Sequence, residues 1–415
     1  MGYFGAGKDI SIQEGVSMKY KGIIITGTSG AGKSTTALEL CEQHSIFQIV
    51  QAITTRESRK EDVLEQYKYI TEEELKKLDK DRPLLIKSEY RGEYYGITRD
   101  AFQQVIDNGK TPLLILTPQS VGELEVKKNS GQYIFFTIFL DASDDVLDER
   151  LTRRREQINN DTRKQREKER EYAKNCLYSV KNDNDNNIVD IVQLIYSLWE
   201  YRNSGGMVPK KLIELMIKCD VLLRNADINK VKGASYDLSL GDQYWQDGKK
   251  KTLDNSNPFI TLKPGDYVLV SSKEITQFPK DIAGRFDLTV SLFCQGLILS
   301  NGPQVDPGFE GRLFCLLFNT SSDSMTLKQG QHYATLEFIK LLEPTIPYSN
   351  KYQGKVDIID YLPTPSAPSV IVKMKEDIEK IKSEKWWEKN LPLILSILAI
   401  VSAIAMGLIL FFINK

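Results

Sequence analysis

Apolar residues in the first 200 positions of the chain form short runs that alternate with helix-compatible stretches. Apolar or β-branched residues dominate 22–26, 112–116 and 133–140. Short buried strands that alternate with helices are typical of a parallel sheet, because each connection between parallel strands must cross over the sheet. The pattern predicts an α/β domain with a parallel sheet at 19–202, preceded by a leader at 1–18.

From Gly233 onward the pattern changes to short strands separated by turns. Residues 259–262 and 267–270 flank a turn that contains Pro-Gly, and 313–318 and 333–339 lie on either side of Gln-Gly. Short strands at regular spacing predict an all-β domain, either a barrel or a jelly roll. An Asn-Ser-Gly-Gly break at 203–206 and a Pro/Ser/Thr stretch at 363–368 place this domain at 207–362.

The C-terminal segment is an uncharged apolar run at 391–413. About 20 apolar helical residues suffice to cross a bilayer, so the run predicts one transmembrane helix, with a buried core helix as the alternative. Four lysines and two tryptophans lie within 380–389. The lysine excess predicts a single-pass C-terminal membrane anchor with the bulk of the protein in the cytoplasm, joined through a linker and helical stalk at 363–390.

The charge and the counts of cysteine and histidine limit which binding partners and metal sites can be expected. The formal net charge is −1, so no nucleic-acid partner is expected. The five cysteines are far apart and lack a C-x-x-C spacing, which argues against a disulfide framework or a zinc site and favours a reducing compartment. Only two histidines are present, which nearly excludes imidazole-rich metal sites.

A glycine-rich motif follows the first predicted strand. Residues 27–34 read Gly-Thr-Ser-Gly-Ala-Gly-Lys-Ser and precede a helix-compatible segment. Glycines let backbone N–H groups face a phosphate, and the helix N-terminus adds a positive dipole. A chance glycine-rich turn is the alternative. We expect Lys33 to contact the β- and γ-phosphates of ATP and Ser34 to bind Mg²⁺. The expected ATP-binding residues are Gly27, Gly30, Gly32, Lys33, Ser34 and Thr35.

The first domain resembles the guanylate kinase family and, beside it, the ribose bisphosphate phosphokinases. The P-loop, Thr-Thr-Arg-x-x-Arg at 54–59 and Tyr-Tyr-Gly at 94–96 carry the resemblance. It implies that Arg56, Arg59 and Tyr95 hold the phosphate of an acceptor. Two guanidinium groups suit a dianionic phosphate, although a solvated basic turn is the alternative.

The same resemblance implies a lid of arginines that closes over the transferring phosphoryl group. The candidates are Arg150, Arg154, Arg155, Arg166 and Arg170, in a stretch that otherwise reads as a charged helix. We expect catalytic roles for Lys33, Arg56, Arg59 and Arg154.

Four positions depart from the guanylate kinase pattern. The acidic guanine reader falls on Ile86, and the hydroxyl after the Tyr-Tyr-Gly turn falls on Ile97. The Asp-x-Asp of the middle strand falls on Ile115 and Thr117. A guanine edge loses its hydrogen-bond partners here, so GMP is a poor candidate acceptor.

The second domain resembles the dCTP deaminase and trimeric dUTPase family over about 150 residues. Its motifs are Gly-Ala-Ser-Tyr-Asp-Leu-Ser-Leu-Gly at 233–241, Val-Asp-Pro-Gly-Phe-x-Gly at 305–311, Phe-Asn at 318–319 and Lys-Tyr-Gln-Gly at 351–354. The resemblance implies a trimer with pockets at the subunit interfaces.

The catalytic groups of that family are altered. Thr289 and Cys294 replace the two arginines of the second motif, Leu316 replaces the general acid/base glutamate, and Thr335 replaces a glutamine. A leucine cannot move protons, so deamination by the usual route should fail. The remaining candidates for deoxynucleotide binding are Ser291, Asp306, Phe309 and Tyr352. For Asp306 a turn aspartate and for Phe309 a core residue are the alternatives.

These patterns together predict a membrane-anchored nucleotide-handling protein. It joins an ATP-dependent phosphotransferase domain to a deoxynucleotide-binding domain that has lost deaminase catalysis. A nucleotide sensor or effector without turnover, in a stress or antiphage role, is one alternative. A bifunctional enzyme of pyrimidine deoxynucleotide metabolism is another. Expected partners are nucleotides or a phosphorylated sugar, with ATP and Mg²⁺ as cofactors.

Overall fold

The computed structural model describes residues 20–58, 66–81, 84–90, 92–121, 135–154, 158–184, 187–362 and 379–402, the last without 382, 384, 387 and 388. The chain divides into two compact units, Met1–Asp360 and Tyr361–Lys415.

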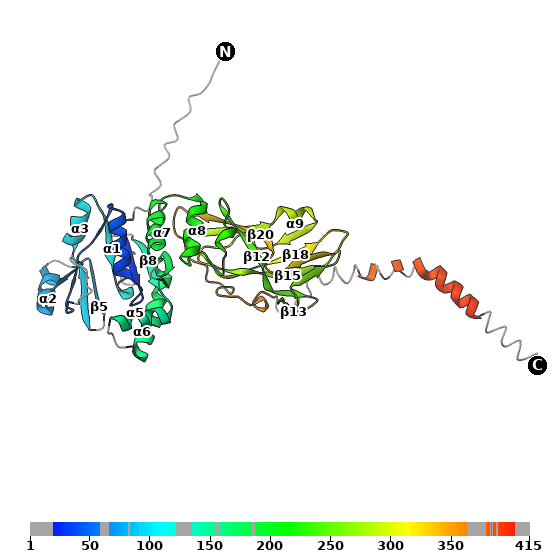
Figure 1. Ribbon diagram of the computed structural model, residues 1–415, viewed down its shortest axis with the longest axis horizontal. Helices are drawn as coiled ribbons and strands as arrows, with labels where there is room; N and C mark the ends of the chain where they lie inside the picture. The colour runs from blue at the N-terminus through cyan, green and yellow to red at the C-terminus, as the bar shows by residue number, and fades with distance from the viewer. Residues whose placement is uncertain are drawn as a thin grey trace, which may run out of the picture. The chain divides into compact units, whose positions relative to one another are not determined.

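A five-stranded parallel sheet forms the centre of the N-terminal half (Figure 1). Its strand order is β2 (Phe47–Ile49), β7 (Thr111–Ile115), β1 (Ile23–Gly27), β8 (Phe136–Asp141) and β9 (Tyr178–Lys181). All five residues of β1 are buried, because helices cover both faces of the sheet. Ile23 and Ile25 pack with α1 (Lys33–Gln43) and α7 (Ile188–Glu200), whereas Ile24 packs with α3 (Arg99–Asp107). The predicted parallel-sheet α/β domain is therefore present.

A second, four-stranded sheet lies beside the first and completes the N-terminal half. Its order is β4 (Tyr67–Tyr69), β3 (Ala52–Thr54), β6 (Glu93–Ile97) and β5 (Ile86–Tyr90), followed in the same lobe by α2 (Glu72–Asp81). Two further helices, α5 (Asp144–Arg153) and α6 (Asn160–Glu171), follow β8 and precede a 3₁₀ turn at Tyr172–Asn175.

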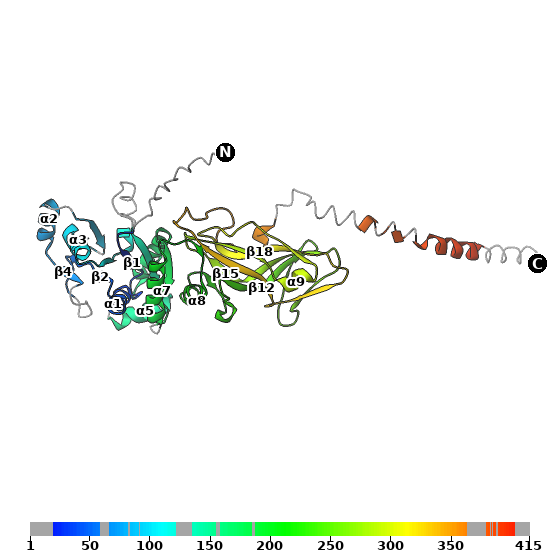
Figure 2. The same ribbon diagram turned by 90° about the horizontal axis from the view of Figure 1, so that it is seen from above.

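The second half is rich in antiparallel strands, which Figure 2 shows from above. Its nine-stranded sheet contains β10 (Gly206–Met207), β20 (His332–Lys340), β12 (Ser235–Gln246), β15 (Tyr267–Gln277), β18 (Glu310–Asn319), β17 (Leu297–Ser300), β11 (Leu223–Arg224), β13 (Lys249–Thr252) and β16 (Ile282–Leu288). Strands β14 (Phe259–Leu262) and β19 (Met325–Lys328) form a separate pair. The domain also contains the short helices α8 (Lys210–Lys218) and α9 (Val290–Cys294) and 3₁₀ turns at Ile228–Lys230 and Ile358–Tyr361. The β-rich domain predicted as a barrel or jelly roll is present as a half-barrel.

The two halves of the first unit share one hydrophobic cluster, which includes Ile23 of β1 and Phe338 of β20. A buried polar group also joins them. Asp281 accepts hydrogen bonds from the Tyr178 hydroxyl at 2.6 Å and from the Lys340 ammonium at 2.7 Å. Burial and the negative charge of Asp281 raise the pKa of Tyr178 well above its ordinary value, so the phenol is a stable donor.

The C-terminal segment requires a correction. Within the described residues, no helix is long and apolar enough to cross a membrane. The predicted transmembrane helix at 391–413 is therefore wrong for the described part of the chain, and residues 403–413, like 363–378, lie outside it.

Candidate functional site

A cavity of about 430 Å³ opens where β1 ends and the glycine-rich loop leads into α1. It brings together residues that are far apart in the sequence. Its lining includes Gly27, Ser29, Gly30, Lys33, Ser34, Thr35, Arg56, Gln66, Tyr95, Arg154 and Glu169. Five of the six predicted ATP-binding residues and two of the predicted acceptor-binding residues thus share one cavity, whereas Gly32 lines a neighbouring one. The third, Arg59, lies outside the described residues.

The glycines of the loop are required by close approaches of the backbone. Gly27 has φ +143°, and a Cβ there would lie 1.9 Å from the carbonyl oxygen of Leu140. Gly32 has φ +89°, and a Cβ there would lie 2.7 Å from the side-chain nitrogen of Asn182. That Asn182 nitrogen donates to the carbonyl of Ala31 at 2.8 Å. Larger residues would therefore displace the loop from the neighbouring strands β8 and β9.

Lys33 begins α1, and its ammonium folds back onto the loop. It donates to the carbonyl oxygens of Gly27 at 3.0 Å and Thr28 at 2.9 Å. Burial lowers the pKa of Lys33 to about 8, although the negative charge of Glu169 opposes this effect. An arriving phosphate would replace two carbonyl dipoles with a full negative charge, so the ammonium is placed to exchange partners.

The side of the cavity that contains the predicted acceptor-binding residues Arg56 and Tyr95 lies next to the four-stranded sheet. The Arg56 guanidinium lies 5.1 Å from the ring centre of Tyr67 and 5.9 Å from that of Tyr69. Tyr95 meets Tyr67 edge to face, with ring centres 6.3 Å apart. Stacking on aromatic rings fixes the plane of a guanidinium, which suits bidentate contact with a phosphate.

The far wall of the cavity is aliphatic at the positions where the family reads guanine. Ile86 and Ile97 line it and are buried, and Ile115 and Thr117 line it as well. The polar groups nearby are hydroxyls: Thr117 contacts Ser120 at 2.8 Å, and Ser120 donates to Ser88 at 2.6 Å.

The arginines predicted to form a lid divide into those that line the cavities and those that form ion pairs with α5. Arg154 lines the main cavity and also a neighbouring one of about 450 Å³, which Gly32, Arg150 and Arg153 line from the other side of the loop. The buried Arg166 pairs instead with Asp144 and Asp148 of α5, and Arg155 lies outside the described residues.

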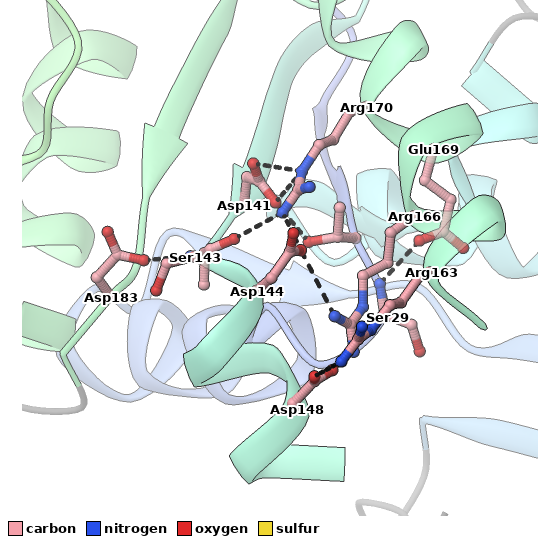
Figure 3. Close-up of polar contacts among 12 residues, drawn as sticks. Ser29, Asp141, Ser143, Asp144, Asp148, Arg163, Arg166, Glu169, Arg170 and Asp183 are labelled. Atoms are coloured by element: carbon pink, nitrogen blue, oxygen red, sulfur yellow. Dashed lines mark hydrogen bonds and ion pairs between the residues drawn. The ribbon is translucent and has the colours of Figure 1, made fainter. Parts of the chain in front are cut away.

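Asp141, at the end of β8, is a residue that sequence reasoning missed. Its carboxylate accepts from Thr28 at 2.9 Å and from Lys181 at 2.9 Å. It also accepts from Arg170 at 3.1 Å, as Figure 3 shows. Burial opposes its ionisation, but the hydrogen bond and charge of Lys181 and the charge of Arg170 prevail, so its pKa lies below the ordinary value. Asp141 therefore ties the glycine-rich loop to α6 and β9. Its position directly after an apolar strand was the signal that could have identified it.

The side chains that line the main cavity limit which metal ion it can hold. The Ser34 hydroxyl lines the cavity and accepts from Gln66 at 3.3 Å. Across the described ranges, no group of three or more His, Cys, Asp or Glu side chains is arranged around a metal position. Mg²⁺ commonly keeps its waters and binds one or two protein groups together with substrate phosphates, so the residues present fit Mg²⁺ that arrives with a polyphosphate.

The second half places its candidate residues on different elements. Ser291 lies on α9, where its hydroxyl is 3.3 Å from that of Thr289. Asp306 accepts from Gln304 at 2.7 Å. Phe309 belongs to the hydrophobic core and meets Tyr348 edge to face at 5.5 Å, which favours the core alternative for this residue. Tyr352 is half-buried, with Lys351 4.5 Å from its ring centre.

Leu316 lies on the partly exposed face of β18, since residues along this strand alternate between buried and half-buried. Its partners in register are Leu269 of β15 and Ser300 of β17. Neither side chain can take the place of a proton-transferring carboxylate.

A glycine-rich phosphate cradle on a parallel sheet, joined to an antiparallel half-barrel, defines a two-domain P-loop nucleotide-binding protein. The family model described as guanylate kinase matches residues 19–197, and the model described as dCTP deaminase-like matches residues 208–341. The chain belongs to the guanylate kinase family through its first half and to the dCTP deaminase-like family through its second, and this fusion makes it a nucleotide-handling protein.

Individual relatives match each half separately. A dCTP deaminase of Thermococcus kodakarensis is 35% identical over 139 residues, which is 33% of this chain and 88% of the relative. A dCTP deaminase of Pyrococcus horikoshii is 30% identical over 144 residues, or 34% of this chain and 91% of the relative. A guanylate kinase of Clostridium perfringens is 32% identical over 177 residues, or 42% of this chain and 81% of the relative.

Proposed function

We propose that the N-terminal half transfers a phosphoryl group from ATP to a small phosphorylated acceptor. The observation that carries this proposal is the single cavity that extends from Lys33 and Ser34 to Arg56 and Tyr95. Phosphoryl transfer depends mainly on holding donor and acceptor next to each other and on neutralising charge. A cavity with cationic groups from both sides meets these two requirements.

Each residue has a role in this reaction. Lys33 and the amides of the loop bind the β- and γ-phosphates while the acceptor oxygen bonds to the γ-phosphorus and the bond to ADP breaks. Arg56 orients the acceptor phosphate, and Arg154, which faces both cavities, offsets charge on the transferring group. Ser34 and the phosphate oxygens would hold Mg²⁺, which supplies further charge neutralisation.

The acceptor is proposed not to be GMP. A guanine base against Ile86 and Ile97 would lose the hydrogen bonds that an acidic side chain and a hydroxyl otherwise supply. Unpaired polar edges in a buried site reduce turnover by about 10²-fold or more.

The test is ADP release from ATP–Mg²⁺ by the full chain with GMP, dCMP, dUMP and ribose phosphates as acceptors. Lys33→Ala should abolish release, and Lys21→Ala, an exposed position outside the cavity, should not change it. Equal ADP release by Lys33→Ala would contradict the proposal.

We propose further that the second half binds a deoxynucleotide without deaminating it. Leu316, with Leu269 and Ser300 as neighbours, supports this reading. Thermal-shift titration of the full chain with dCTP, dUTP, dTTP and the ribonucleotides tests binding, and chromatography of dCTP incubations tests turnover. We expect a shift with at least one deoxynucleotide and no uracil product; the absence of any shift contradicts the binding role.

A homotrimer is the assembly that we propose for this half. Two side chains of α9 expose apolar surface, Val290 at 76% and Phe293 at 65%, and Ile298 of β17 is exposed nearby in sequence. Exposed apolar surface of this kind marks interfaces. Light scattering on the full chain should give a trimer mass that Phe293→Asp reduces, and a monomeric wild-type chain would contradict the proposal.

A further inference from the structure

A carboxylate of α6 contacts the glycine-rich loop at 27–34, which we call the phosphate cradle. Glu169 is in the last turn of α6, its side chain is only 1% exposed, and it lines the same cavity as Lys33 and Ser34. One of its oxygens accepts a hydrogen bond from the backbone N–H of Ser29 at 3.0 Å (Figure 3). Ser29 belongs to the glycine-rich loop, whose amides are the donors that a P-loop offers to phosphate.

The contact between the Glu169 carboxylate and the Ser29 N–H resembles the contact that a bound anion would make with this loop. A carboxylate oxygen on a loop N–H occupies a position that suits a phosphate oxygen, and both acceptors carry negative charge. The charge of Glu169 also acts on Lys33, whose ammonium it favours. Two donors of the glycine-rich loop are therefore already paired within the chain: the Ser29 amide donates to Glu169, and the Lys33 ammonium donates to the carbonyls of Gly27 and Thr28.

The helix that carries Glu169 is held on both sides of this residue. Arg166, one turn earlier, pairs with Asp144 and Asp148, and Arg170, the next residue, pairs with Asp141 and Asp144 (Figure 3). These pairs join α6 to β8 and α5, so the Glu169 side chain is directed into the cavity by a fixed backbone rather than placed there by a loose loop.

Taken together, these contacts lead us to propose that Glu169 competes with the donor polyphosphate for the cradle and so sets the affinity of the site for ATP. This inference rests on the proposed phosphotransferase function and adds an affinity-determining residue to it. A phosphate that takes the Ser29 amide must displace the Glu169 carboxylate, because two negative charges on one donor repel each other. Part of the binding free energy of ATP is then used to move Glu169 out.

The test compares Glu169→Gln with Glu167→Gln in the full chain. Glutamine keeps the length of the side chain and can still accept from Ser29, but it carries no charge and competes less well with phosphate. Glu167→Gln removes the same charge from an exposed position on the same helix. Hydrogen bonds to charged acceptors are stronger than those to neutral acceptors by about 1 kcal/mol. Glu169→Gln should therefore bind ATP about fivefold to tenfold more tightly than wild type, and Glu167→Gln should bind it about as tightly as wild type.

Isothermal titration calorimetry with ATP–Mg²⁺, and separately with inorganic tripolyphosphate, measures both variants. Tighter binding of both ligands by Glu169→Gln than by wild type supports the inference. Binding that is measurable in Glu169→Gln but in neither wild type nor Glu167→Gln also supports it. Equal or weaker binding, with Lys33-dependent binding retained, overturns the inference and leaves the phosphotransferase proposal standing. Absence of ATP binding in wild type, Glu169→Gln and Lys33→Ala alike overturns both.

Discussion

The two halves of the chain use charged residues in opposite ways. In the N-terminal half, Lys33, Arg154 and Glu169 all face one cavity. In the second half, the positions at which the related family uses two arginines and a glutamate hold Thr289, Cys294 and Leu316. On the functions proposed above, the first half keeps cationic groups that would bind and neutralise phosphate, whereas the second keeps a fold in which a leucine stands at the position of the proton-transferring group. Retention of a fold is thus a weaker guide to chemistry than the side chains that line its site.

The sharpest way to test this contrast is to remove one candidate residue from each half and measure nucleotide binding. Lys33→Ala should weaken ATP binding by about 10²-fold, since a buried ammonium that contacts phosphate contributes roughly 3 kcal/mol. Asp306→Ala should change deoxynucleotide binding by less than about tenfold, because its observed partner is the exposed Gln304. Calorimetry on the full chain measures both, and the reverse order of effects would contradict the contrast.

A second test concerns the contact that joins the halves. Asp281→Asn should lower the free energy of unfolding by about 3–5 kcal/mol, because it leaves the buried Lys340 ammonium without its counter-charge and weakens the hydrogen bond from Tyr178 of the N-terminal half. Asp323→Asn, at an exposed position, should change it by less than about 0.5 kcal/mol. Urea denaturation followed by tryptophan fluorescence provides the measurement. Equal stability of the two variants would show that Asp281 does not join the halves energetically.

The acid sensitivity of the N-terminal half should depend on Asp141. Its pKa in the folded protein lies below the ordinary 3.8, so it stabilises the fold above about pH 4 and that contribution is lost as pH falls through the folded pKa. Asp141→Asn should cost about 1–3 kcal/mol at pH 7 and much less near pH 2. Denaturation curves at both pH values test this, and a cost independent of pH would argue against the ionised carboxylate.

The smallest expected effect is the pH dependence of ATP binding. Burial lowers the pKa of Lys33 to about 8, so the ammonium that binds phosphate is lost as pH rises through this value. ATP affinity should therefore fall severalfold between pH 7 and pH 9. Calorimetry across this range measures it. Affinity that stays constant up to pH 9 would place the pKa of Lys33 higher.

The P-loop and the parallel sheet could be predicted from sequence because their signals are local. The glycines and Lys33 occupy fixed offsets, and buried strands such as β1 and β8 are continuous apolar runs. The position of Asp141 at the end of an apolar strand could have marked it as a candidate, but its contacts and the place of Glu169 could not be predicted from sequence, since both depend on α6 packing against β8 and the loop. The transmembrane prediction rested on hydropathy over 391–413 alone, and within the described residues no helix is long and apolar enough to cross a membrane.

The most direct test of the account is one incubation of the purified full chain with ATP–Mg²⁺, dCTP and the acceptor panel. Chromatography then quantifies ADP and every cytosine and uracil nucleotide. The account predicts ADP release that Lys33→Ala abolishes and no formation of a uracil nucleotide from dCTP. Accumulation of dUTP or dUMP, or ADP release that survives Lys33→Ala, would contradict it.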